Sequence, residues 1–133
     1  MLYRTVSEQD MQSCATKFAD TAKIGDCLAL HGNLGAGKST FARYFIKHLL
    51  HDVSEIPSPT FTIMQQYDKD IVHIDCYRLE SIDDAINIGM LDIIPYSISL
   101  IEWPEIVADL LPHHTQHLHF FTKDDIHYIE HDN

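Results

Sequence analysis

The chain has 133 residues, 45% of them hydrophobic, and its 9 Lys and Arg against 20 Asp and Glu give a formal net charge of −11 at pH 7. Because a chain of this length buries about two thirds of its unfolded surface, we expect residues 1–133 to form a single domain. The acidic balance, with basic residues scattered singly, argues against direct binding of duplex nucleic acid, which needs clustered Lys and Arg.

The first expected helix covers about residues 8–23. Ser7, with Asp10 three residues later, is typical of a helix N-terminus, and the apolar residues that follow recur at helical spacing: Met11, Cys14, Ala15, Phe18, Ala19 and Ala22. Residues 27–30 form a short apolar run of the kind that is buried in a parallel sheet. The chain is thus expected to begin with a helix and then a strand.

A glycine-rich stretch separates that strand from a second expected helix over residues 38–50. One stripe of this helix is apolar and carries Phe41, Tyr44, Phe45 and Leu49. Residues 57–59, Pro-Ser-Pro, predict a connecting loop, because proline lacks an N–H and keeps its predecessor extended. Residues 62–67 and 71–75 resemble two strands joined by a short polar turn, which predicts a hairpin-like pair.

Short elements follow in the second half of the chain. A helix is expected between Ser81, which caps it, and Gly89, which ends it. Residues 98–101 predict a strand, and a helix is expected to begin at Pro104 and stop before Pro112.

Two further strands, residues 118–122 and 126–130, are expected to close the chain as an antiparallel pair at an edge of the sheet.

The clearest chemical motif lies between the first strand and the second helix. It matches the phosphate-binding pattern G-x-x-x-x-G-K-[ST] with Gly32, Asn33, Leu34, Gly35, Ala36, Gly37, Lys38 and Ser39. Its glycines let backbone N–H groups point at phosphate oxygens, and we expect Lys38 to reach the β- and γ-phosphates from an exposed loop and Ser39 to ligate Mg²⁺. The motif predicts an α/β fold, a single P-loop NTPase domain with a mostly parallel central sheet flanked by helices, with antiparallel edge strands and the nucleotide at the carboxyl ends of the strands.

A Mg²⁺ ion held by one hydroxyl and by phosphates also needs a carboxylate at a strand end. Asp75 and Glu102 both stand directly after apolar strand residues. Either could be an ordinary surface acid. Beside a phosphate loop, both are expected to face the nucleotide.

Four strings of the chain, in order and spacing, resemble the bacterial TsaE (YjeE) family: Gly32–Thr40, Ser58–Thr62, His73–Leu79 and Ile101–Pro104. That family is the small ATPase needed to make threonylcarbamoyladenosine next to the anticodon of tRNA. The resemblance implies ATP and Mg²⁺ as ligands, slow hydrolysis by the chain alone, and a TsaB–TsaD complex as the partner through which tRNA is met indirectly.

The resemblance also implies roles for single residues. The nucleotide is implied to lie on Asn33, Leu34, Gly35, Ala36, Gly37, Lys38, Ser39 and Thr40. Glu102 is implied to be the second protein group on the metal, beside Ser39, and Trp103 to face the partner or the site. Asp75 lies beside the γ-phosphate and Thr60 in a switch-like loop, so Asp75, Thr60 and Lys38 are the implied catalytic residues.

Two residues depart from the family pattern. The family usually has Asp where this chain has Asn33, and often Thr where it has Ser39. Serine keeps the hydroxyl that a metal needs. Asn33 removes a negative charge from the mouth of the loop.

Three other functions compete with an ATPase. A GTP-binding switch is suggested by residues 122–125, Thr-Lys-Asp-Asp, but no Asp-x-x-Gly follows the phosphate loop, so adenine is preferred and the tetrapeptide is interpreted as a polar hairpin turn. A small-molecule kinase would need several Arg or Lys from a lid, and the chain has three arginines in all. A nucleotide-gated adaptor would share the site with negligible turnover, and a single-turnover assay would separate it from an ATPase.

The chain is rich in histidine, but most of these residues are interpreted as surface groups. His117 and His119 would share one strand face, yet no Cys or carboxylate is spaced to complete a tetrahedral metal site. Arg78 is compatible with two interpretations, an arginine finger supplied by the chain itself or an ion-pair partner of the many acids.

The remaining features favour a cytoplasmic location. Cys14, Cys27 and Cys76 are odd in number and far apart, which predicts reduced, mostly buried thiols. No apolar run approaches the roughly 20 residues that span a bilayer, and the N-terminus lacks the basic and apolar parts of a signal peptide. We therefore expect no membrane contact.

Overall fold

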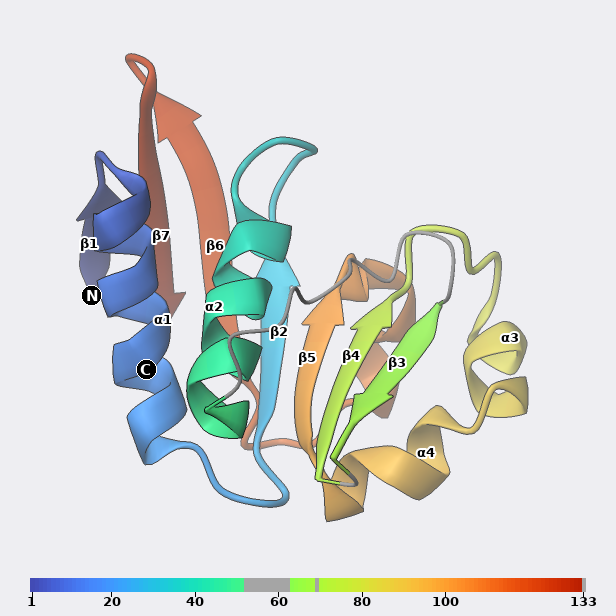
Figure 1. Cartoon of the computed structure of the whole chain (residues 1–133). Coiled ribbons are helices and arrows are strands. Elements are labelled where there is room, and N and C mark those ends of the chain that lie inside the picture. The colour runs from blue at the N-terminus through green and yellow to red at the C-terminus, as the bar shows by residue number, and fades with distance from the viewer. Residues whose placement is uncertain (52–62, 69, 133) are drawn as a thin grey trace.

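The computed structural model describes residues 1–51, 63–68 and 70–132, which form a seven-stranded sheet with helices on both faces (Figure 1). The strands in chain order are β1 (Leu2–Thr5), β2 (Cys27–His31), β3 (Met64–Tyr67), β4 (Ile71–Asp75), β5 (Ile98–Glu102), β6 (Gln116–Lys123) and β7 (Ile126–Asp132). Their spatial order is β1-β7-β6-β2-β5-β4-β3.

The centre of the sheet is parallel and its flanks are antiparallel. Strands β6, β2, β5 and β4 pair in parallel, whereas β7 pairs antiparallel with β6, β1 with β7, and β3 with β4. The predicted α/β fold is therefore confirmed. The register places Leu30 and Asp75 on either side of Glu102, so the ends of β2, β5 and β4 meet at one edge of the sheet.

Two long helices cover one face of the sheet, α1 (Glu8–Thr21) and α2 (Lys38–Leu50). The other face is covered by α3 (Ile82–Asn87), α4 (Met90–Ile93) and two 3₁₀ helices, η1 (Ile94–Tyr96) and η2 (Pro104–Leu110). The predicted cap of α1 is confirmed, because the Ser7 hydroxyl accepts a hydrogen bond from the Asp10 N–H at 3.1 Å. Apolar side chains from both helices and the sheet, including Phe18, Phe41 and Leu100, form the core on the α1 and α2 face.

Two sequence-based expectations need correction, and three short elements were not predicted. β6 is not part of an edge pair, because it lies between β2 and β7 in the sheet and the edge strand is β1, which was not predicted. β1 has four residues, of which only Thr5 is buried, so it lacks a clear apolar alternation. The segment that begins at Pro104 is a 3₁₀ helix, and α4 and η1 were also not predicted. The predicted loop 57–59 lies outside the described residues.

The cysteines are buried, as expected. Cys14, Cys27 and Cys76 are all free thiols inside the molecule. Burial raises the pKa of Cys14 and Cys27 to about 11 and that of Cys76 to about 12. Within residues 1–51, 63–68 and 70–132, no helix is long and apolar enough to cross a membrane.

Candidate functional site

The glycine-rich loop leaves the carboxyl end of β2 and enters α2, at the edge where β5 and β4 also end (Figure 1). Gly32 and Gly37 both have positive φ, 146° and 102°. A Cβ on Gly32 would lie 2.4 Å from the backbone oxygen of Phe120, and one on Gly37 would lie 2.9 Å from the Met11 side chain. Glycine is therefore required at Gly32 by both backbone conformation and close approach.

A cavity of about 340 Å³ opens between this loop and the ends of the neighbouring strands. Most of the predicted site residues line it: Leu34, Gly35, Gly37, Lys38, Ser39, Thr40, Asp75, Glu102 and Trp103. The loop and two strand ends thus converge on one hollow. This is the place that a phosphate chain would occupy if the motif binds nucleotide.

Two predicted residues of the loop stand outside the cavity lining, and one lies beyond the described part. Asn33 is exposed, and its carbonyl oxygen accepts a hydrogen bond from the Ala36 N–H at 3.2 Å. Ala36 is buried and packs into the core beneath α1 and α2. Thr60 lies outside the described residues.

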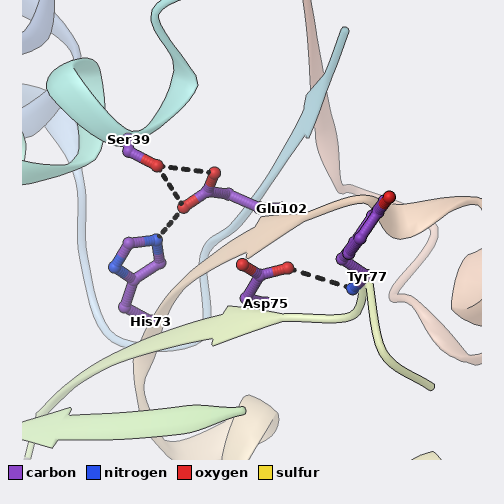
Figure 2. A network of polar contacts seen from close by, with 5 residues as sticks. All are labelled: Ser39, His73, Asp75, Tyr77 and Glu102. Carbon is purple, nitrogen blue, oxygen red and sulfur yellow. Dashed lines mark hydrogen bonds and ion pairs between the residues drawn. The ribbon is translucent and has the colours of Figure 1, made fainter. Parts of the chain in front are cut away.

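A buried polar network connects α2 to β5 and β4 (Figure 2). The Ser39 hydroxyl donates to the two carboxylate oxygens of Glu102, at 3.0 Å to Oε1 and 3.3 Å to Oε2. Nε2 of His73 lies 2.6 Å from Oε2 of Glu102. Burial by itself would raise the pKa of the Glu102 carboxyl, but the contacts with His73, Ser39 and Lys38 lower it below its usual value. Glu102 is thus held as a carboxylate inside the protein.

Asp75 lies next to Glu102 in the sheet register and lines the same cavity. Its Oδ1 accepts a hydrogen bond from the Tyr77 N–H at 3.0 Å (Figure 2). Burial raises the pKa of the Asp75 carboxyl, and the Glu102 charge adds to this, while the Tyr77 N–H and Lys38 act in the opposite direction. A carboxylate with a raised pKa accepts a proton more readily than an exposed aspartate does.

Lys38 is covered, in contrast to the exposed lysine that was expected. Its side chain is only 5% exposed, because its ammonium nitrogen lies 3.5 Å from the centroid of the Trp103 ring and donates to the Gly32 carbonyl. The backbone of Trp103 is left-handed, with φ 54°. The centroid of its ring lies 5.0 Å from the centroid of the Tyr77 ring. Burial lowers the pKa of Lys38, while nearby carboxylates oppose this. Trp103 therefore contacts the lysine of the loop directly.

The donor set fits a hard divalent cation. Ser39 Oγ and Glu102 Oε1 are 3.0 Å apart and both residues line the cavity, with the Asp75 carboxylate on the adjacent strand. Mg²⁺ prefers oxygen ligands and usually takes one or two protein groups together with phosphates and water. These residues are therefore chemically suited to Mg²⁺.

A second polar cluster lies on the opposite face of β2. His31 is the last residue of β2, and its Nε2 lies 2.9 Å from Nδ1 of His117. Its ring stacks on that of His119, with 4.5 Å between the ring centroids. Oε1 of Glu105 lies 3.7 Å from the Nδ1 of His31. His117 and His119 thus share a strand face. Among the residues that the structure describes, no group of three or more His, Cys, Asp or Glu has the arrangement of a metal site.

This histidine cluster predicts acid sensitivity of the fold. Burial and then the neighbouring imidazoles lower the pKa of His31, and Glu105 opposes them. The unfolded chain, with a histidine pKa of about 6.5, therefore binds this proton more readily than the folded protein, and stability is lost as the pH falls through about 6.5. In urea unfolding at pH 8 and pH 5.5, His31→Asn should lose less stability on acidification than the wild type. His113→Asn, at an exposed position, controls for loss of one imidazole, and equal losses in wild type and His31→Asn would contradict the prediction.

Sequence reasoning missed the role of two residues in the site. His73 lies between Val72 and Ile74 in a strand that is otherwise apolar up to Asp75. A polar residue at such a position was the sequence signal that could have indicated a role in the site. Tyr77 lines the cavity and its ring packs at a tilt against the ring of Trp103. Nothing in the sequence around Tyr77 distinguishes it from an aromatic residue at the surface.

Comparison with known proteins supports these observations. The model of the family described as "Threonylcarbamoyl adenosine biosynthesis protein TsaE" matches residues 5–129. The tRNA threonylcarbamoyladenosine biosynthesis protein TsaE of Rickettsia bellii is 38% identical over 109 residues, which are 80% of this chain and 76% of that protein. Its counterpart from Bacillus subtilis is 36% identical over 115 residues, which are 83% of this chain and 70% of that protein.

A solved structure is similar over almost the whole chain. The crystal structure of Bacillus subtilis YdiB superposes with a TM-score of 0.75 at 29% identity, covering 98% of this chain and 83% of that one. The similarity in sequence and the similarity in fold therefore extend over the same domain.

Proposed function

Because this chain belongs to the TsaE family of tRNA threonylcarbamoyladenosine biosynthesis proteins, we propose that it is a Mg²⁺-dependent ATPase that acts in this modification through a TsaB–TsaD-like complex. The observation that carries the ATPase proposal is the convergence of Lys38, Ser39 and Glu102 on one cavity beside the glycine-rich loop. Hydrolysis is expected to be slow without the partner.

The loop and four side chains of the cavity have chemical tasks in this proposal. Loop N–H groups and the Lys38 ammonium would bind the phosphates, and Ser39 and Glu102 would hold the metal. When bound, Mg²⁺ would neutralise charge on the β- and γ-phosphate oxygens. Asp75 has Oδ1 fixed by the Tyr77 N–H, and its Oδ2 can accept a hydrogen bond from the water that attacks the γ-phosphate.

In this proposal the nucleoside lies in a second hollow of about 290 Å³, which adjoins the other side of the loop. The turn from Thr5 to Glu8 lines it together with Gly35, Thr40 and His127. Asp124 and Asp125 form a two-residue turn between β6 and β7, with φ 54° and 63°, which confirms the interpretation of residues 122–125 as a hairpin turn. We therefore assign these residues the role of a hairpin turn, and adenine stays the proposed base.

The charge of the molecule supports action through a partner. The net charge is −11, and in the described lining of the cavity beside the glycine-rich loop the basic residues are Lys38 and Arg78. A kinase would need further cations to clamp a second phosphorylated substrate, and tRNA would need an extended basic surface. We therefore propose that tRNA is reached through the partner complex. The cytoplasmic location expected from the sequence stays a prediction.

A nucleotide screen tests the choice of base. ATP and ADP at about 100 times their Kd should raise the unfolding temperature by about 10 °C, because a ligand that binds only the folded state stabilises it by about 2.7 kcal/mol at that ratio. GTP and GDP should shift it much less, and Asp125→Asn should change neither result. GTP binding as tight as ATP binding, lost in Asp125→Asn, would overturn the adenine assignment.

A further inference from the structure

His73 occupies an unusual place for an imidazole. It lies in the middle of β4, is 0% exposed, and by strand alternation faces the same side of the sheet as Ile71 and Asp75, beneath α2. In the described part of the chain, its Nδ1 atom has no hydrogen-bond partner. A buried nitrogen without a partner is unfavourable, so an apolar side chain would suit this position better if packing were its task.

The other ring nitrogen makes a short and directed contact. Nε2 lies 2.6 Å from Oε2 of Glu102 (Figure 2). An ionised carboxylate can only accept hydrogen bonds, so Nε2 carries the proton and donates it. His73 thus holds Oε2, while Ser39 Oγ lies closer to Oε1, at 3.0 Å, than to Oε2, at 3.3 Å.

We propose that His73 is a positioning residue that fixes the Glu102 carboxylate, so that Oε1 stays beside Ser39 Oγ, where the two residues would hold a divalent cation. The inference rests on the proposed function, because it assumes that Ser39 and Glu102 hold Mg²⁺. Glutamate has several rotatable bonds, and the hydrogen bond from His73 removes that freedom. In metal sites generally, loss of a group that orients a ligand weakens metal affinity or activity by about 10–100-fold.

The test measures by what factor Mg²⁺ increases the affinity of the protein for ATP. The Kd of ATP is determined by calorimetry in EDTA and in excess MgCl₂, and the ratio of the two values is compared between variants. His73→Leu and His73→Asn cannot reach Glu102, and this ratio should fall about tenfold or more, while the Kd in EDTA stays near the wild-type value. His73→Gln carries an amide N–H at the reach of Nε2 and should restore most of the ratio. If His73→Leu fails to fold, the comparison of the Gln and Asn variants decides.

Ser99→Ala is the matched control, because Ser99 is also buried on a central strand with an oxygen that has no partner in the described residues, yet it faces the other side of the sheet from Glu102. It should leave the ratio unchanged. An unchanged ratio in His73→Asn and His73→Leu, an equal weakening of ATP binding in EDTA, or no rescue by Gln would each overturn the positioning role. A wild-type ratio of one would instead refute the proposed metal site, and the inference with it.

Discussion

Lys38→Ala is expected to remove ATP binding and leave the fold intact. The Lys38 ammonium lies in the cavity beside the loop, and hydrogen bonds to charged groups contribute about 1.5–3 kcal/mol each, so the affinity should fall about 100-fold or more. The fold should survive, because burial already lowers the pKa of this lysine and its removal takes a charge out of a buried place. Calorimetry with ATP and the far-ultraviolet circular dichroism spectrum measure the two effects.

Lys23→Ala provides the matched control for charge. Lys23 is exposed and lies shortly before the start of β2, at the opposite end of the strand from the loop. Its removal should leave ATP affinity at the wild-type value. Unchanged ATP affinity in Lys38→Ala would show that the glycine-rich loop is not the phosphate site.

Glu102→Gln is expected to separate nucleotide binding from metal dependence. Glutamine keeps the volume but removes the charge that Mg²⁺ needs, and its amide N–H₂ must face either Ser39 or His73, both of which donate to the carboxylate. ATP should still bind in EDTA, whereas the Mg²⁺ concentration for half-maximal hydrolysis should rise about tenfold or more. Hydrolysis rates across a MgCl₂ titration provide the measurement.

The exposed Glu80 provides the control, because Glu80→Gln makes the same chemical change outside the cavity lining. This variant should follow the wild-type titration. Full activity of Glu102→Gln at low Mg²⁺ would place the metal carboxylate elsewhere, and Asp75 would then be the first residue to test.

Elements with a strong period were predictable from the sequence, and short elements were not. Helices α1 and α2 have long apolar stripes, and strands β2, β4 and β5 consist mostly of apolar residues, which depends on local sequence alone. β1 is a strand because β7 offers it a partner at the far end of the chain, and the Met1 amino group donates to the His131 carbonyl. The interior place of β6 likewise depends on its parallel pairing with β2, which no local pattern records.

In the site, too, some features follow from local sequence and others depend on contacts between distant segments. The glycine-rich loop has a fixed sequence pattern, and the nearness of Asp75 to Glu102 was predictable because parallel strands end at one edge. Trp103 lies over the ammonium group of Lys38, and His73 contacts Glu102. Both contacts join residues from different elements, so only the folded structure brings them together. Nothing in the structure explains the Asn33 departure beyond its exposed place in the loop.

The most direct test of the central claim is the rate of ATP hydrolysis by the purified chain with and without a TsaB–TsaD complex. We expect slow turnover by the chain alone and a clear stimulation by the complex, with Trp103→Ala reducing the stimulation more than it reduces ATP binding. Rapid turnover by the chain alone that ignores the complex would contradict the account and favour an independent hydrolase or kinase.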